Sequence, residues 1–202
     1  AMKLDANSRI SLSNNDSSGD ATCTLFGYQA GNAIADGDDN NTMIGHMAGL
    51  VTTGAGNTYV GFSAGKGASG AETGNTAVGT NALLDIVSGE YNVAVGFQSA
   101  QNLTSGDENI VMGTNSLNLA TSTVNCIALG RNAMQGITTN GIDSAVAIGY
   151  GAFTGASGTT TGANNTIAIG RDAFSALTTG ANNLAVGYLA GKTLTTGGQN
   201  IA

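Results

Sequence analysis

The side chains that can do chemistry are few in this sequence, and their spacing matches no complete catalytic motif. His46 is the only histidine among 202 residues, and no motif pairs it with a serine, a cysteine or a carboxylate. Gly65–Gly70 fits a GxGxxG pattern, but a chain with 32 glycines produces such a pattern by chance. Gly191-Lys192-Thr193 looks like the end of a phosphate-binding loop, yet Val186 stands where the first glycine of that loop belongs. We therefore expect no enzymatic activity and no cofactor.

Oxygen ligands are concentrated in one segment, which contains Asp36, Asp38 and Asp39. Carboxylates at this density can bind Ca²⁺, but the twelve-residue spacing of an EF-hand is absent, and the Gly/Asp nonapeptide of calcium-binding rolls does not recur. We interpret Asp36–Asp39 as a solvated corner and keep a calcium site as the alternative. Asp107 and Glu108 form a similar charged corner.

The overall composition argues against several classes of partner. Thirteen carboxylates against six cations give a formal net charge of −7, and the lysines and arginines are scattered singly. Nucleic-acid binding needs clustered cations, so we expect none. No apolar run approaches the roughly 20 residues of a membrane span, so we expect no membrane insertion. A chain with no proline, no tryptophan and 9% charged residues is also unlike an average enzyme.

A repeat occupies most of the chain. A β-prone triplet, a glycine, two variable residues and then alanine or serine recur ten times. The repeat glycines are Gly27, Gly45, Gly61, Gly79, Gly96, Gly113, Gly130, Gly149, Gly170 and Gly187. Their separations run from 16 to 21 residues and centre on 17, the length of one solenoid coil. We number positions in each coil from this glycine, so that position −1 precedes it and position +1 follows it.

The residue at position −1 is apolar in every repeat. We predict that it points inward and forms the core ladder of the stack, because alternate residues of a half-buried strand share one face. The predicted core ladder comprises Phe26, Ile44, Val60, Val78, Val95, Met112, Leu129, Ile148, Ile169 and Val186.

Two other positions predict close contact between neighbouring coils. Position +3 is small in every repeat, which indicates that another backbone passes beside it: Ala30, Ala48, Ala64, Ala82, Ser99, Ser116, Ala133, Ala152, Ala173 and Ala190. Asparagine usually stands at position −4 or −5, where it tolerates a left-handed corner and where amides one coil apart can hydrogen-bond into a ladder. These asparagines are Asn41, Asn57, Asn75, Asn92, Asn109, Asn125, Asn165 and Asn183.

Position +1 collects half of the ten aromatic residues of the chain. The aromatic members of this column are Tyr28, Phe62, Phe97, Tyr150 and Tyr188, and the other members are His46, Thr80, Thr114, Arg131 and Arg171. Such a column can stack sugar rings along the molecule, or it can pack one chain against another. We favour packing between chains, because the sequence has no tryptophan, the side chain best suited to sugar stacking.

Short β segments of about five residues that alternate with Gly/Asn corners predict an all-β fold, a parallel β-solenoid of about ten 17-residue coils. The absence of proline fits, since nearly every backbone N–H must pair with a neighbouring coil. At roughly 4.8 Å per coil the rod is on the order of 50 Å long. We expect residues 1–22 to be an N-terminal capping or linker segment. Residues 23–202 form the solenoid domain, with an interrupted eleventh repeat starting at Asn200.

The repeat units resemble those of two groups of fibrous proteins. The AVG and AIG units are similar to the head repeats of trimeric autotransporter adhesins and haemagglutinins, and Asn75–Leu83 looks still more like repeats of bacteriophage tail fibres. The resemblance implies a left-handed β-roll that assembles as a parallel homotrimer. It also implies a place in the virion, or alternatively on the bacterial surface.

The resulting expectation is a structural segment of a phage tail fibre that supports adhesion to a host receptor, either a cell-surface glycan or a protein. The alternative is a head segment of a bacterial trimeric adhesin. An alternative of another class is a glycan- or ice-binding solenoid, but its regular Thr-x-Thr or aromatic face is missing, because Thr159–Thr161 does not recur.

Two irregularities remain in the repeat. Cys23 and Cys126 share position −4 but lie six repeats apart, about 29 Å at the usual strand spacing, so they cannot bond within one chain. If that position faced a threefold axis, links between chains would be possible. The longest steps insert residues in Gly136–Ser144 and Thr154–Asn164, which we interpret as tolerated filler, with binding loops as the alternative.

Overall fold

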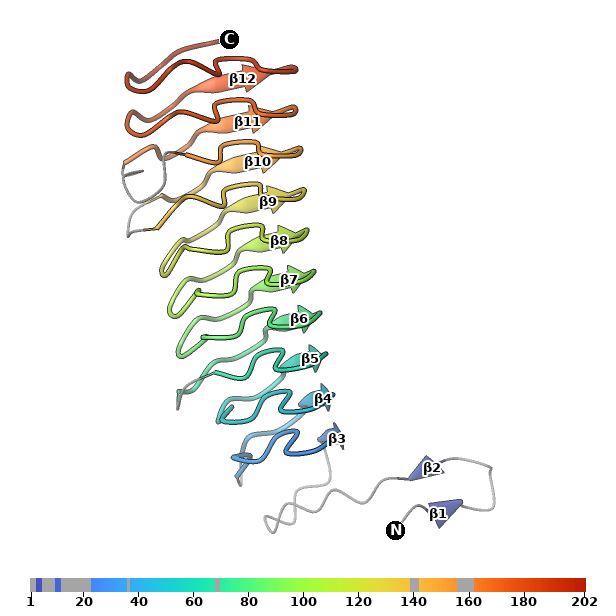
Figure 1. Ribbon diagram of the computed structural model, residues 1–202. Coiled ribbons are helices and arrows are strands. Elements are labelled where there is room, and N and C mark those ends of the chain that lie inside the picture. Colours follow the sequence, from blue (N-terminus) through green and yellow to red (C-terminus); the bar gives the residue numbers. More distant parts are fainter. Residues whose placement is uncertain are drawn as a thin grey trace.

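The chain forms a stack of coils, each contributing one short strand to a single parallel sheet (Figure 1). The computed structural model describes residues 3–4, 10–11, 23–35, 37–67, 70–138, 142–155 and 162–202. The strands of the stack are β3 (Thr24–Phe26), β4 (Thr42–Ile44), β5 (Thr58–Val60), β6 (Thr76–Val78), β7 (Val93–Val95), β8 (Ile110–Met112), β9 (Ile127–Leu129), β10 (Val146–Ile148), β11 (Ile167–Ile169) and β12 (Leu184–Val186). A separate antiparallel pair joins β1 (Lys3–Leu4) to β2 (Ile10–Ser11).

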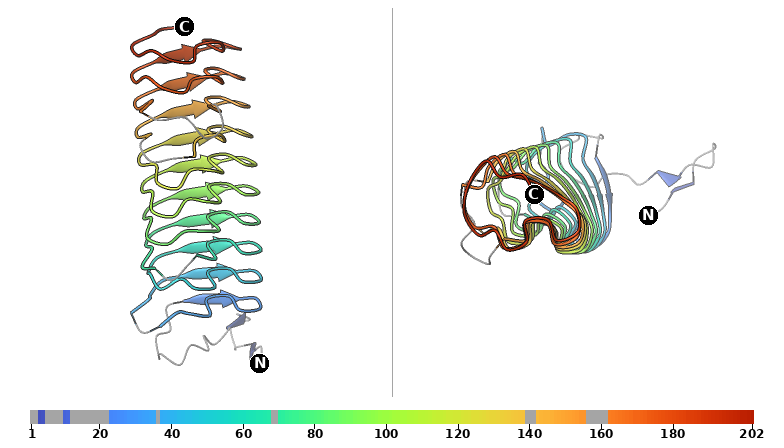
Figure 2. Two further views of the ribbon diagram at one scale, coloured as in Figure 1. Left: turned by 60° about the vertical axis from the view of Figure 1, so that its left-hand side comes forward. Right: turned by 90° about the horizontal axis from the view of Figure 1, so that it is seen from above.

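The order of the strands confirms the predicted parallel β-solenoid. The sheet runs from β3 to β12 in chain order, and each strand pairs in parallel with the strand of the next coil. Ile201 pairs in parallel with Leu184, so the eleventh repeat begins as the sequence predicts. The part of the chain that the structure describes contains no helix. Seen along the stack, the coils follow one common outline that is indented on one side (Figure 2).

The strands have three residues rather than the expected five, because the backbone leaves the extended region on both sides. Position −5 is left-handed, with φ of 56° at Tyr91 and 57° at Glu108. The repeat glycines have φ between 127° and 143°. A Cβ atom on Gly79 would lie 2.5 Å from the carbonyl oxygen of Gly96 in the next coil. Only glycine fits where successive coils approach so closely.

The strand phase that we predicted is wrong. The middle residue of each strand, position −2, points inward, and Met43, Tyr59 and Ala94 are fully buried. Because side chains alternate along a strand, position −1 then faces outward. The expected core ladder is therefore a column of exposed or half-buried side chains: Phe26, Ile44, Val60, Val78, Val95, Met112, Leu129, Ile148, Ile169 and Val186.

The interior is filled by pairs of residues at positions −2 and +4. Where position −2 is large, position +4 is glycine: a Cβ on Gly65 would lie 2.4 Å from the ring of Tyr59. Where position −2 is alanine, position +4 is a large, fully buried residue in four of six coils, as Phe174 is beside Ala168; the exceptions are Ala94 with Ala100 and Ala185 with Gly191. Position +3 is buried in eight coils, from Ala48 to Ala173, as predicted for a crowded site. Gly65 therefore belongs to the packing of the core.

The predicted asparagine ladder is confirmed at position −4. The Asn75 Oδ1 atom accepts the backbone N–H of Asn92 at 2.8 Å, and the Asn92 Oδ1 atom accepts that of Asn109 at 3.0 Å. These amides are buried inside the coils, so the ladder satisfies groups that water cannot reach. Asn125 and Asn165 lie outside the ladder, at position −5, with φ of 57° and 54°.

Candidate functional site

The outer face of the ten-stranded sheet is uncharged along its whole length. Positions −3 and −1 of every strand point outward, and both columns consist of aliphatic, threonine, methionine and phenylalanine side chains without a charge. The exposed fractions reach 59% at Phe26, 44% at Met112 and 58% at Val186. A continuous uncharged stripe with exposed apolar side chains is typical of a surface that contacts another molecule.

Position +1 forms a second outward column directly after the repeat glycines. In the first three coils the rings stack: the centroids of Tyr28 and His46 are 5.3 Å apart, and those of His46 and Phe62 are 5.2 Å apart with an angle of 5°. All three rings come from successive coils, so the coil spacing sets the stacking distance. His46 is therefore part of an aromatic stack.

The last four coils carry a different arrangement at position +1. The Arg131 guanidinium lies 5.9 Å from the centroid of the Tyr150 ring, and the Arg171 guanidinium lies 5.4 Å from the same ring. Arg171 also lies 5.9 Å from the ring of Tyr188. Cations at these distances over aromatic faces are attracted by the ring quadrupole. We call Arg131, Tyr150, Arg171 and Tyr188 the Arg–Tyr ladder.

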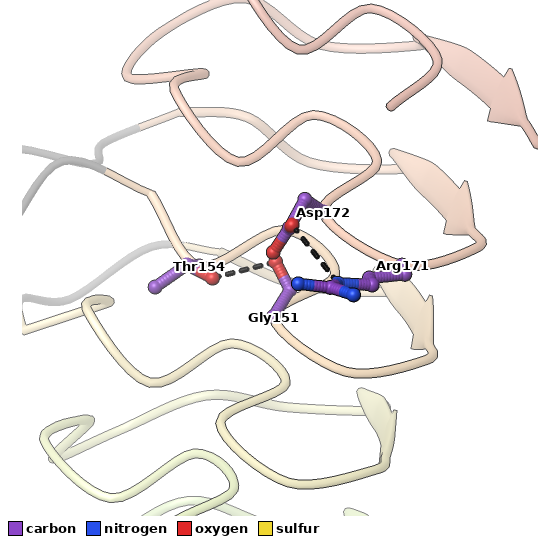
Figure 3. Close-up of polar contacts among 4 residues, drawn as sticks. All are labelled: Gly151, Thr154, Arg171 and Asp172. Atoms are coloured by element: carbon purple, nitrogen blue, oxygen red, sulfur yellow. Dashed lines mark hydrogen bonds and ion pairs between the residues drawn. The ribbon is translucent and has the colours of Figure 1, made fainter. Parts of the chain in front are cut away.

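Arg171 is held by a further contact to Asp172 (Figure 3). Its Nε atom lies 3.4 Å from Asp172 Oδ2. Asp172 lies above Gly151, where a Cβ atom would be 2.5 Å from the Asp172 Oδ1 atom, so the glycine leaves room for this carboxylate. The Thr154 hydroxyl donates to the Gly151 carbonyl oxygen at 2.6 Å and closes the turn below it (Figure 3). Arg131 has no carboxylate partner within the described ranges.

One carboxylate lies inside the described part of the rod. Glu72 is fully buried, and neither of its carboxyl oxygens has a partner at hydrogen-bonding geometry; the hydroxyl of buried Tyr59 also lacks one. Burial raises the pKa of Glu72 to about 7, and Asp38 adds to the rise, while Thr52 and the backbone of Glu72 oppose it in part. Burial and the nearby Glu72 also raise the pKa of Tyr59 well above its usual value. The sequence gives no signal for this site.

Both cysteines are buried and free, which confirms that they do not bond within the chain. They replace asparagine in the interior ladder: the Cys126 thiol donates to the Ile142 carbonyl oxygen at 3.3 Å, and the Cys23 thiol to that of Asp38 at 3.2 Å. Because position −4 faces the interior of each coil, it does not face a neighbouring chain. Disulfides between chains at these positions, which the sequence left open, are thus sterically blocked in the folded rod.

Several candidates from the sequence lie only partly in the described residues. Asp36 is outside them, while the Asp38 carboxylate accepts the backbone N–H of Ala35 at 2.8 Å, as expected of a corner. The central parts of the two insertions, 139–141 and 156–161, are also outside, as are Thr159–Thr161 and most of residues 1–22. Among the residues described, no three His, Cys, Asp or Glu side chains cluster as metal ligands.

Comparisons with known proteins add no assignment. No protein-family model, no curated protein and no solved structure matches this chain. Within the described ranges, no helix has the length and apolar character needed to span a bilayer. The chain is therefore defined by its architecture, a parallel β-solenoid with coils of about 17 residues. Sequence reasoning found the position +1 column but missed the alternation of arginine and tyrosine, which a comparison of that position in successive repeats would have revealed.

Proposed function

We propose that this chain is a structural segment of a homotrimeric phage tail fibre that supports adhesion to a host receptor. The observation that carries the proposal is the uncharged outer face of the sheet, formed by positions −3 and −1 along ten coils. The repeat units resemble those of tail fibres, and such a face is what a subunit interface requires.

A second copy of the same chain is the partner that fits this face best. The face repeats with the coil spacing over the whole rod, so a parallel copy in register presents the same period to it. The interior of each coil is thin and often closed by alanine, as at Ala77, Ala94 and Ala128. A chain with so little apolar bulk inside gains its stability from burying the outer face as well.

Light scattering of the purified chain tests the proposal, with a trimer of the 19.8 kDa chain as the expected species. Met112→Asp places a carboxylate in the exposed column and should convert the trimer to monomers, because three desolvated charges would meet at the interface. Ser105→Asp adds the same charge at an exposed position half a coil away from the strands and should remain trimeric. A wild-type monomer at micromolar concentration, or a trimeric Met112→Asp variant, would contradict the proposal.

A further inference from the structure

The charge of the chain is distributed unevenly along the rod. Of the solenoid domain, residues 23–126 contain eight carboxylates and one cation, whereas residues 127–202 contain two carboxylates and three cations. The formal charge therefore changes from −7 to +1 between these two parts. Although the whole chain is acidic, its C-terminal part, residues 127–202, carries a small positive formal charge, so its local field does not repel anions.

Two of these three cations belong to the Arg–Tyr ladder. The guanidinium groups of Arg131 and Arg171 lie on the two sides of the Tyr150 ring, and the Arg171 side chain is 63% exposed. Stacking on a ring restricts a guanidinium while its N–H edge stays available for hydrogen bonds. The ion pair with Asp172 is made through Nε, so it does not use the terminal nitrogens. Both arginines are thus oriented in advance for an anionic ligand.

The spacing of the two arginines defines the kind of ligand. They stand two coils apart, a separation of about 9–10 Å at the usual strand spacing. An extended polysaccharide that carries a carboxylate on every second sugar repeats its charge at a comparable distance. The phenol groups of Tyr150 and Tyr188 can hydrogen-bond to the sugar hydroxyls between the charges. Tyr188, with 68% of its surface exposed, extends the site along the rod.

We propose that the Arg–Tyr ladder binds a linear acidic polysaccharide that lies along the rod, with sugar carboxylates on Arg131 and Arg171. This goes beyond the structural role proposed above and gives the segment a ligand of its own. The proposal gives the two ends of the position +1 column different roles, because the stack of Tyr28, His46 and Phe62 contains no arginine or lysine.

Titration with hyaluronan oligosaccharides, in which every second sugar carries a carboxylate, tests this site. The wild type should bind them in 50 mM NaCl, should bind more weakly as salt is added, and should not bind neutral dextran. Arg131→Gln and Arg171→Gln should each weaken binding about tenfold, since each removes one charged hydrogen-bond donor group. The double variant should show no measurable binding. Lys192→Gln removes a cation of the same half that lies off the column, and should change the affinity less than twofold.

Three results would overturn the inference. They are no binding by the wild type in 50 mM NaCl, unchanged binding by the double variant, and equal binding of poly-glutamate, which would indicate an acidic protein as the ligand. Light scattering and thermal melting of the same samples separate this test from that of the fibre. A monomeric wild type that still binds hyaluronan through the two arginines would refute the trimer and support the polysaccharide site.

Discussion

Glu72 should make the stability of the rod depend on pH between about 4.5 and 7. Its pKa rises from 4.5 to about 7 on folding, because the buried carboxyl has neither solvent nor a basic partner. The folded chain therefore keeps a proton that the unfolded chain releases, so the stabilising contribution is complete below pH 4.5 and is lost as the pH rises through 7. A difference of 2.5 pKa units corresponds to about 3 kcal/mol per chain.

Thermal melting, monitored by circular dichroism at pH values between 5 and 8, measures this loss of stability. For a chain of this size about 3 kcal/mol corresponds to a fall in Tm on the order of 6–12 °C. Glu72→Gln is neutral at all these pH values, so its Tm should vary much less and should exceed that of the wild type at pH 8. Glu108→Gln, at an exposed corner, is the matched control and should follow the wild type. An equally steep decline in Glu72→Gln would refute the reasoning.

The columns of the coil give three further predictions. Ala94→Asp should abolish cooperative melting, because it buries an unpaired carboxylate inside a coil at a cost of several kcal/mol, whereas Val95→Asp should keep the β-sheet circular dichroism and lose only the trimer. Asn92→Ala should lower the denaturant midpoint by an amount equivalent to about 2–4 kcal/mol, because it leaves the buried N–H of Asn109 unpaired; an unchanged midpoint would argue against the ladder. The Cys126 thiol, whose pKa burial raises to about 11, should react slowly with an aromatic disulfide reagent at pH 8 and rapidly in guanidinium; equal rates would place it at the surface.

Much of this fold could be predicted from the sequence, because the requirements of each coil recur at fixed positions. The repeat glycine reports a close approach of two backbones, and small residues at position +3 report a crowded interior. The amide ladder follows from Asn75 and Asn92 standing one coil apart at position −4. Each of these requirements admits only one or two residue types, so the pattern survives in a single sequence.

The direction of the strand side chains could not be predicted in the same way. Val95 looks like a core residue because it is apolar, yet it is Ala94 that occupies the interior, where Ala100 and Leu103 are also fully buried. The apolar character of a side chain indicates that it is buried, but it does not indicate which surface the side chain packs against. A face that contacts another chain and a face that fills a coil give the same pattern. Glu72 was missed for the opposite reason, since a single carboxylate in one coil leaves no periodic signal.

Position +1 is the part of the coil that the fold constrains least. The left-handed backbone limits positions −5 and +2, the amide ladder limits position −4, and the interior volume limits positions −2, +3 and +4. At position +1 the chain instead accepts rings, hydroxyls and cations, from Tyr28 through Thr80 to Arg171, and all point outward. The coil therefore does not require the change from an aromatic stack to an Arg–Tyr ladder along this one column. If the Arg–Tyr ladder binds a ligand as proposed, substitutions at position +1 should alter binding while the coil keeps its stability.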